Sequence, residues 1–208
     1  AFYRSGVKSF TLPKKVTIID ADAFRGCRSL ETFLFEADSE LVSIKSSAFS
    51  NSGLKTFTLP KKVTIIDQYA FYGCSSLETF LFEADSELVS IKSRAFFNSG
   101  LKTFTLPKKV TIIDQYAFYS CSSLETFLLE DCDSALTTLG SSSFSGTGLS
   151  GSTVRLPAAV QSYVSGAQFP SGTTVEYINL HECRCQSGAI SAQGLLTVGV
   201  DVEEIPDD

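Results

Sequence analysis

The stretch LKTFTLPKKVTIIDQYAFYGCSS, residues 54–76, is one unit of the tandem repeat that determines the fold. The block at residues 7–53 returns at residues 54–100 and again from residue 101, and only eight of its 47 positions differ between the first two copies. A second version of the unit, LETFLFEADSELVSIKSSAFSNSG, occupies residues 30–53. Ala-Phe pairs recur at alternating spacings of 25 and 22 residues, so the basic unit is about 23 residues long.

Each unit begins with a short half-buried strand, because Leu54, Phe57 and Leu59 alternate with threonines. A unit of this size cannot bury its apolar face alone, so we expect the units to stack as turns of a solenoid with parallel strands about 4.8 Å apart. Pro60 follows the strand, where a missing N–H costs least, and Asn-Ser-Gly at residues 51–53 marks the turn before the next strand. The side chains expected to point inward in one turn are Leu54, Phe57, Leu59, Val63, Ile66, Ala70 and Phe71.

The string LPKKVTIIDQYAFYGCSSL, residues 59–77, resembles the repeat of BspA-like proteins, the treponemal class of leucine-rich repeat. The resemblance runs from residue 1 to about residue 170, although the glycine usual after the V-x-x-I isoleucine is replaced, for example by Asp67 and Lys92. It implies a β-rich, right-handed leucine-rich-repeat solenoid with a short parallel strand in each turn, short 3-10 or irregular convex segments, and a C-terminal capping β element. Proteins of this family are mostly surface-exposed or secreted, and several are implicated in adhesion to host or matrix proteins.

The chain divides at about residue 170. Residues 1–170 form the repeat array of about seven turns, and residues 1–6 align with residues 95–100, so the array starts in the middle of a repeat. We therefore expect further repeats and a leader upstream of this segment. Residues 171–208 hold two β-rich runs that are expected to cap the last turn, and they end in an acidic tail.

Composition and charge limit the class of partner. A hydrophobic content of 43% with 12% aromatic residues is enough for a packed core. The formal net charge is −6, but the last eight residues carry five acids, which leaves −1 for the rest of the chain. A nearly neutral body argues against nucleic acid as a partner, and the absence of a run of 18 apolar residues argues against membrane insertion by this segment. The resemblance favours an extracellular or cell-surface location.

Three columns of outward-facing residues are expected along the concave face of the solenoid. One alternates in charge, so neighbouring turns can neutralise each other, and the other two are rich in threonine. A generic β surface, a protein-binding face and an ice- or mineral-matching surface all remain open for these columns. The candidate binding residues are Lys8, Thr11, Glu31, Thr32, Leu34, Lys55, Thr56, Thr58, Glu78, Thr79, Leu81, Lys102, Thr103, Thr105, Glu125, Thr126 and Leu128.

An aromatic column is expected along one edge of the stack. Tyr72, Phe97 and Tyr119 follow three consecutive Ala-Phe pairs, and Tyr69 and Tyr116 precede two of them. Exposed aromatic clusters are enriched at interfaces, so these residues are candidates for a partner or self-assembly surface. The alternative is that they only cover the edge of the core.

The six cysteines fall into two groups. Cys27, Cys74 and Cys121 recur every second turn, about 10 Å apart, which is too far for a disulfide, so we expect buried thiols. A disulfide from Cys132 to Cys183 or Cys185 is possible in an extracellular protein, and these cysteines with His181 could alternatively hold zinc. The Cys-x-Cys spacing is tighter than in usual zinc sites, so we expect neither a metal nor a cofactor.

The sequence does not favour an enzyme. It contains one histidine and none of the motifs of phosphate-binding loops, dinucleotide sites or metalloproteases. We expect a noncatalytic binding or adhesion module of a cell-surface or secreted protein, with a matrix or surface protein as partner. The alternative is a structural protein that assembles with itself into fibres or a surface coat by stacking of repeats.

Overall fold

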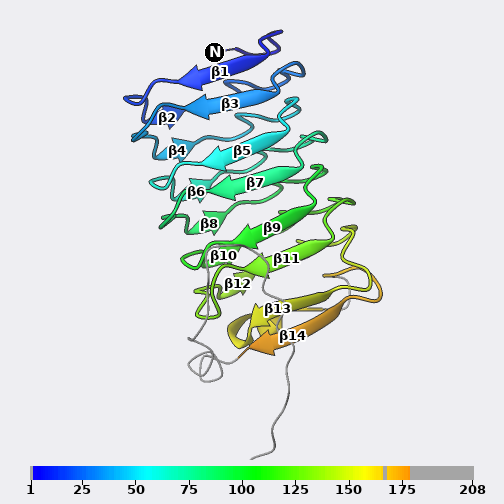
Figure 1. Ribbon diagram of the computed structural model, residues 1–208. Helices are drawn as coiled ribbons and strands as arrows, with labels where there is room; N and C mark the ends of the chain where they lie inside the picture. The colour runs from blue at the N-terminus through cyan, green and yellow to red at the C-terminus, as the bar shows by residue number, and fades with distance from the viewer. Residues whose placement is uncertain (1, 166–167, 179–208) are drawn as a thin grey trace, which may run out of the picture.

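The computed structural model describes residues 2–165 and 168–178, which form one stack of parallel turns (Figure 1). Each complete turn contributes two strands, a long one and a short one. The long strands have four residues each: β1 (Ser9–Leu12), β3 (Thr32–Phe35), β5 (Thr56–Leu59), β7 (Thr79–Phe82), β9 (Thr103–Leu106) and β11 (Thr126–Leu129). The short strands have two: β2 (Ile18–Ile19), β4 (Ser43–Ile44), β6 (Ile65–Ile66), β8 (Ser90–Ile91), β10 (Ile112–Ile113) and β12 (Thr138–Leu139).

The solenoid predicted from the repeat is confirmed, with one addition. The sequence predicts a single strand per turn, whereas the second, short strand of each turn builds a six-stranded parallel sheet in the order β2-β4-β6-β8-β10-β12. A second alternation explains it, because Ile65 is exposed and Ile66 is buried. The long strands pair in parallel as β1-β3 and β5-β7-β9-β11, so like residues of successive turns are neighbours, for example Phe57 beside Phe80.

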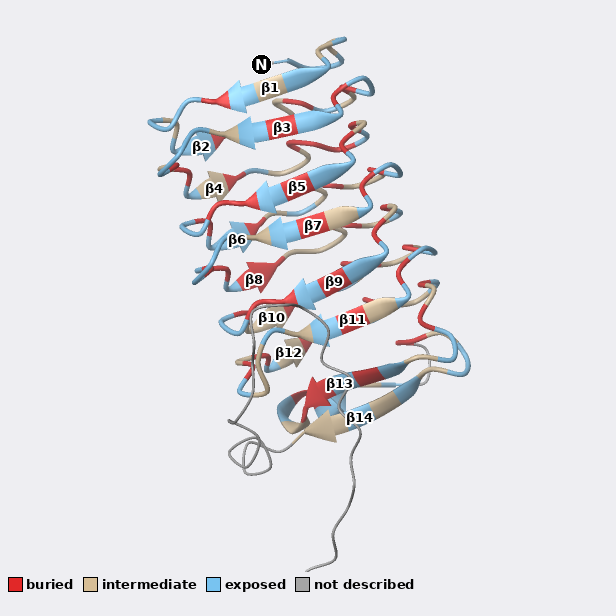
Figure 2. Ribbon diagram, in the orientation of Figure 1, coloured by how far each residue is buried: buried red, intermediate tan, exposed pale blue. Residues whose placement is uncertain are grey.

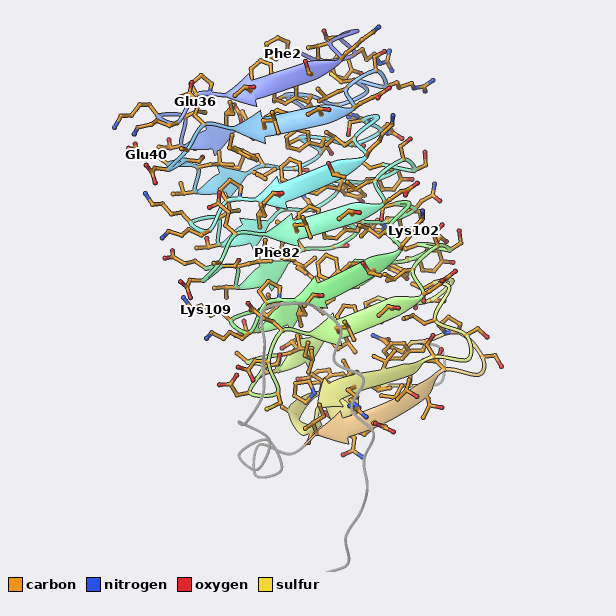
Figure 3. All side chains as sticks on the ribbon, viewed as in Figure 1. Phe2, Glu36, Glu40, Phe82, Lys102 and Lys109 are labelled. Atoms are coloured by element: carbon orange, nitrogen blue, oxygen red, sulfur yellow. The ribbon has the colours of Figure 1, made fainter. Side chains whose placement is uncertain are left out.

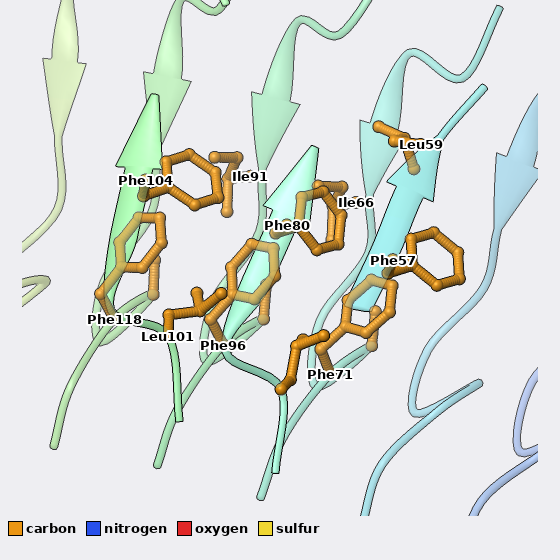
Figure 4. Close-up of a cluster of buried hydrophobic side chains, with 14 of the residues drawn as sticks. Phe57, Leu59, Ile66, Phe71, Phe80, Ile91, Phe96, Leu101, Phe104 and Phe118 are labelled. Atoms are coloured by element: carbon orange, nitrogen blue, oxygen red, sulfur yellow. The ribbon is translucent and has the colours of Figure 1, made fainter. Parts of the chain in front are cut away.

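Two ladders of phenylalanine rings fill the space between the sheets (Figure 4), and each long strand from β3 to β11 is buried at its phenylalanine position (Figure 2). The rings of the Ala-Phe pairs stack nearly parallel, and the Phe71 and Phe96 centroids lie 5.4 Å apart at 8°. The rings of the long strands form the second ladder, and Phe80 meets Phe96 edge-on at 4.9 Å. The first ladder consists of Phe2, Phe24, Phe49, Phe71, Phe96, Phe118, Phe144 and Phe169.

Side chains and close backbone contacts lock each turn to the next. The Lys61 N–H after β5 donates to Glu83 Oε2 of the following turn at 3.0 Å. The same bond recurs one block earlier and one block later. Gly53 packs so tightly on the carbonyl oxygen of Arg28 in the preceding turn that a Cβ there would clash with it. The Asn-Ser-Gly turn therefore needs glycine for close approach of two backbones.

The end of the described chain continues the stack. β13 (Thr153–Pro157) is followed by the 3-10 helix η1 (Ala158–Tyr163), the one helix in the described part of the chain, and by β14 (Thr174–Ile178). β14 pairs in parallel with β13, so a parallel strand lies beyond the expected boundary near residue 170. That boundary stays a prediction, because the second β-rich run and the acidic tail lie outside the described residues. No helix in the described ranges is long and apolar enough to span a bilayer.

Replacing Phe96 by alanine should cost about 3–5 kcal/mol of unfolding free energy, because it removes a fully buried ring that packs on rings of both adjacent turns. Leu81→Ala is the matched control, since this leucine is 53% exposed, and it should change stability by less than about 0.5 kcal/mol. Urea unfolding followed by circular dichroism measures both. Similar losses in the two variants would contradict the assignment of the ring ladder as the core.

Candidate functional site

The outward side chains of β1, β3, β5, β7, β9 and β11 form the long-strand face, where the sequence places its concave-face candidates. The alternating charge column there forms ion pairs, with Lys55 Nζ 2.6 Å from Glu31 Oε2 and Lys102 Nζ 2.6 Å from Glu78 Oε2. The hydrogen bond from Lys55, and then its charge, lower the pKa of the Glu31 carboxyl. Figure 3 places Lys102 at the lateral edge of the stack, where β9 begins. The paired lysines and glutamates on this face therefore neutralise each other.

The two other columns of the long-strand face are polar and apolar in turn. Leu81 of β7 is 53% exposed and lies beside Thr58 of β5, and Leu128 of β11 lies beside Thr105 of β9 in the same way. A threonine therefore separates exposed leucines. No continuous apolar stripe forms across the described turns of this face.

The segments that lead from a short strand to the next long strand form one edge of the stack, on the right in Figure 1. In each segment two residues flank the Ala-Phe pair, which is Ser-Phe at residues 143–144, and all of them except the buried Ser50 reach the surface. The residues before the pair are Asp22, Ser47, Tyr69, Arg94, Tyr116 and, in the last segment, Ser142. The residues after it are Arg25, Ser50, Tyr72, Phe97, Tyr119 and Ser145.

The column after the pair contains a stack of three rings. Tyr72 and Phe97 lie 5.1 Å apart at 15°, and Phe97 and Tyr119 lie 5.1 Å apart at 17°. All three are half-buried. Tyr69 packs on Tyr72 at 5.7 Å, and Tyr116 packs on Tyr119 at 5.6 Å, so the structure brings the five predicted edge aromatics together.

Arg94 joins this cluster, and the sequence analysis missed it. Its Cζ lies 5.8 Å from the Tyr69 ring centroid and 4.7 Å from that of Tyr116, so the guanidinium packs on both rings. Arg94 Nη1 also donates to Tyr69 Oη at 3.2 Å. The signal that could have found it is its position in the column of the two tyrosines. We call Tyr69, Tyr72, Arg94, Phe97, Tyr116 and Tyr119 the aromatic edge.

A hollow of about 490 Å³ borders the aromatic edge. The segment around Phe49 carries Ser47 and Ser50, where the following segments carry Tyr69 and Tyr72 or Arg94 and Phe97. Small side chains thus stand next to a stack of rings, and the change from large to small residues leaves the hollow. We call it the Ser47–Ser50 hollow. Sequence reasoning missed it, because it arises from residues of four successive segments.

Differences between the first two blocks concentrate at this edge. Of the eight positions that differ, four lie in the two columns that flank the Ala-Phe pairs. The first block has an aspartate, an arginine and two serines at these positions, and the second block has two tyrosines, an arginine and a phenylalanine. The four pairs are Asp22 and Tyr69, Arg25 and Tyr72, Ser47 and Arg94, and Ser50 and Phe97.

The repeating cysteines are buried, as the sequence predicts. Cys74 Sγ donates to the carbonyl oxygen of Phe49 at 3.1 Å and lies 3.4 Å from Ser52 Oγ, and Cys121 has the same arrangement with Phe96 and Ser99. Burial raises the pKa of both thiols to about 11. Burial likewise raises the pKa of Cys27. These thiols are therefore protonated at neutral pH and belong to the core.

The predicted disulfide and the alternative zinc site fall largely outside the described residues. Cys132 is half-buried, whereas His181, Cys183 and Cys185 lie beyond residue 178. Within the described residues, no three His, Cys, Asp or Glu side chains group closely enough to hold a metal ion. The disulfide remains a prediction.

Six copies of the BspA type leucine rich repeat region match the chain, over residues 1–125 and 43–169. The chain belongs to this family. The resemblance seen in the residues is therefore confirmed, and leucine-rich repeat domains of this kind are usually protein-binding and typically noncatalytic. A search of curated proteins finds no significant match.

Solved structures of bacterial proteins share the repeat. The pneumococcal vaccine antigen PcpA is 28% identical with a TM-score of 0.52, and the match covers 64% of this chain and 30% of that one. A leucine-rich cell surface protein from Faecalibacterium prausnitzii A2-165 is 29% identical with a TM-score of 0.47, over 64% of this chain and 40% of that one. The chain thus spans less than half the length of either relative.

The buried thiols should make stability fall in alkaline solution. The pKa of Cys74 and Cys121 is about 11 in the folded protein and about 9 in the unfolded chain, so their contribution is complete below pH 9 and disappears as pH rises to 11. The expected slope is at most about 1.4 kcal/mol per pH unit and thiol. Urea unfolding at pH 8 to 11 measures it.

The double variant Cys74→Ser and Cys121→Ser is the control, because serine occupies the same column at Ser52 and Ser99. It should show a shallower decline than the native chain. Equal declines would contradict the role of the thiols.

Proposed function

We propose that this chain is a noncatalytic binding module of a cell-surface protein and that its aromatic edge engages a protein partner, a matrix or surface protein. The observation that carries this proposal is the half-buried stack of Tyr72, Phe97 and Tyr119 beside Arg94. Tyrosine and arginine dominate the energetics of protein interfaces, because they offer large flat contact areas with polar ends.

The aromatic edge is a better candidate than the long-strand face. On the long-strand face, lysines and glutamates pair with each other, and a partner would have to break these pairs to use their charges. On the aromatic edge, Arg94 makes no ion pair with a described residue. The ring faces and the guanidinium are also preorganised by their mutual contacts, which lowers the entropy cost of binding.

Backbone geometry supports a functional reason for the aromatic edge. Tyr69, Arg94 and Tyr116 have φ of 59°, 56° and 59°, in the left-handed region where bulky residues are uncommon. Asp22 and Ser47 hold the same position in other turns at 56° and 57°. Keeping tyrosine where aspartate or serine suffices for the fold costs stability and points to a role at the surface.

The proposed surface location rests on relatives. Proteins of the family to which the chain belongs are mostly surface-exposed or secreted. A repeat array in which half of the differences between the first two blocks fall in two columns suits a module that presents side chains to a partner.

Surface plasmon resonance against immobilised collagen, laminin and fibronectin tests the proposal. The triple variant Tyr72→Ser, Phe97→Ser and Tyr119→Ser should weaken binding more than tenfold, because it removes three aromatic contacts. Serine is native to this column at Ser50 and Ser145, so the fold should remain.

The matched control is Leu34→Thr, Leu81→Thr and Leu128→Thr on the long-strand face, where threonine alternates with leucine. It should change affinity by less than about twofold. A loss of binding in the control alone would move the interface to the long-strand face, and binding to none of the three proteins would count against a matrix partner.

A further inference from the structure

The Ser47–Ser50 hollow lies at the border of the aromatic edge and shares Tyr69, Tyr72, Arg94 and Phe97 with it. Its volume of about 490 Å³ lies in the range of small-molecule pockets. Its lining residues come from four successive turns, with Ser47 and Ser50 on one turn and Tyr72 on the next. A single ring with substituents fits within this volume.

Tyr72 is the ring of the hollow that stands next to a small side chain. Phe97 covers one face of Tyr72 at 5.1 Å, and on the other side the same column continues with the buried Ser50, whose side chain is too small to cover a ring. A flat ligand can therefore extend the stack of Tyr72, Phe97 and Tyr119 by one step. The spacing is already set by the rise of the solenoid.

The polar groups around the hollow favour a hydroxylated ring over an aromatic one. Ser47, Ser50 and Asn51 line it with two hydroxyls and an amide, and Asn51 Nδ2 donates to Ser50 Oγ at 3.0 Å. A purely apolar ring would cover these groups without replacing their bonds to water. A pyranose sugar presents polarised C–H groups to the negative face of a tyrosine ring and directs hydroxyls to its rim.

The charges around the hollow favour an acid. Arg25 and Arg94 both line it, and no carboxylate of a described residue does. Arg25 Nη1 holds Asp22 at 3.1 Å but keeps most of its five N–H donors, and Arg94 makes no ion pair with any described residue. A carboxylate on the ligand would take up these donors in charge-assisted hydrogen bonds.

We propose that the Ser47–Ser50 hollow binds one acidic sugar residue, a pyranose that carries a carboxylate, with its C–H face on Tyr72 and its carboxylate toward Arg25 and Arg94. Uronic and sialic acids share this chemistry. The site goes beyond the proposed protein-binding function, although it shares Tyr72 and Arg94 with the aromatic edge, because it adds Arg25, Ser47, Ser50 and Asn51 of the two preceding turns.

Saturation-transfer NMR and calorimetric titration of the full chain test the site with four probes: methyl glucuronide, the methyl glycoside of N-acetylneuraminic acid, methyl glucoside and N-acetyltyrosinamide. At least one acidic glycoside should bind ten times more tightly than methyl glucoside, and the tighter of the two identifies the source. Binding without preference for the acid, or tighter binding of N-acetyltyrosinamide, would overturn the proposal.

The double variant Ser47→Arg and Ser50→Phe fills the hollow and serves as the decisive control. It gives this turn the residues that flank the next like pair, Arg94 and Phe97, and Ser47 already has the backbone φ of Arg94. The variant should therefore fold, with a melting temperature no lower than that of the native chain, and should lose acidic-glycoside binding at least tenfold. Unchanged binding would place the sugar elsewhere and overturn the proposal.

A second variant separates charge from shape. Arg94→Ser should reduce the preference for the acidic over the neutral glycoside at least threefold. The fold should remain, because serine occupies this column naturally at Ser47 and Ser142. An unchanged preference would contradict the role of Arg94.

The filled-hollow variant keeps Phe97, Tyr116 and Tyr119, so failure of the sugar site leaves the matrix-protein result standing, and the reverse also holds.

Discussion

Parallel stacking of phenylalanine rings along the Ala-Phe column is the interaction on which the rest of the structure depends. Successive rings from Phe2 to Phe169 lie 5.0 to 5.4 Å apart and within 9° of parallel. This spacing is close to the ~4.8 Å between hydrogen-bonded strands. Ring stacking and backbone pairing therefore require nearly the same rise per turn, and a unit that satisfies one also satisfies the other.

The same rise organises the surface. The residues that flank each Ala-Phe pair have the same spacing as the buried rings. The ring centroids of Tyr72, Phe97 and Tyr119 are therefore 5.1 Å apart. Two positions per turn can then vary while the scaffold stays constant. The aromatic edge and the Ser47–Ser50 hollow have the same origin. Large residues at successive positions of a column form a stack of rings, and small residues there leave a hollow.

Local pattern predicted the core because periodicity acts within a single turn. Leu54, Phe57 and Ile66 are buried, as their alternation with polar residues predicts. Cys74 is a buried thiol, as the small serines at the same position of the neighbouring turns indicate. The short strands were missed because two residues carry too little alternation to register in a sequence. Arg94 was missed because its contacts are made with Tyr69 and Tyr116, which lie in other turns.

The sequence by itself determined the repeat length, the inward-facing residues, the parallel stacking and the membership of the aromatic column, since all of these follow from periodicity and from the burial that a small unit cannot achieve alone. Only the tertiary structure decided that Arg94 lies between two tyrosines and that Ser47 and Ser50 open a hollow beside Tyr72. The physical reason is that such contacts depend on backbone φ and on side-chain direction across a rise of about 5 Å, which no single repeat unit encodes.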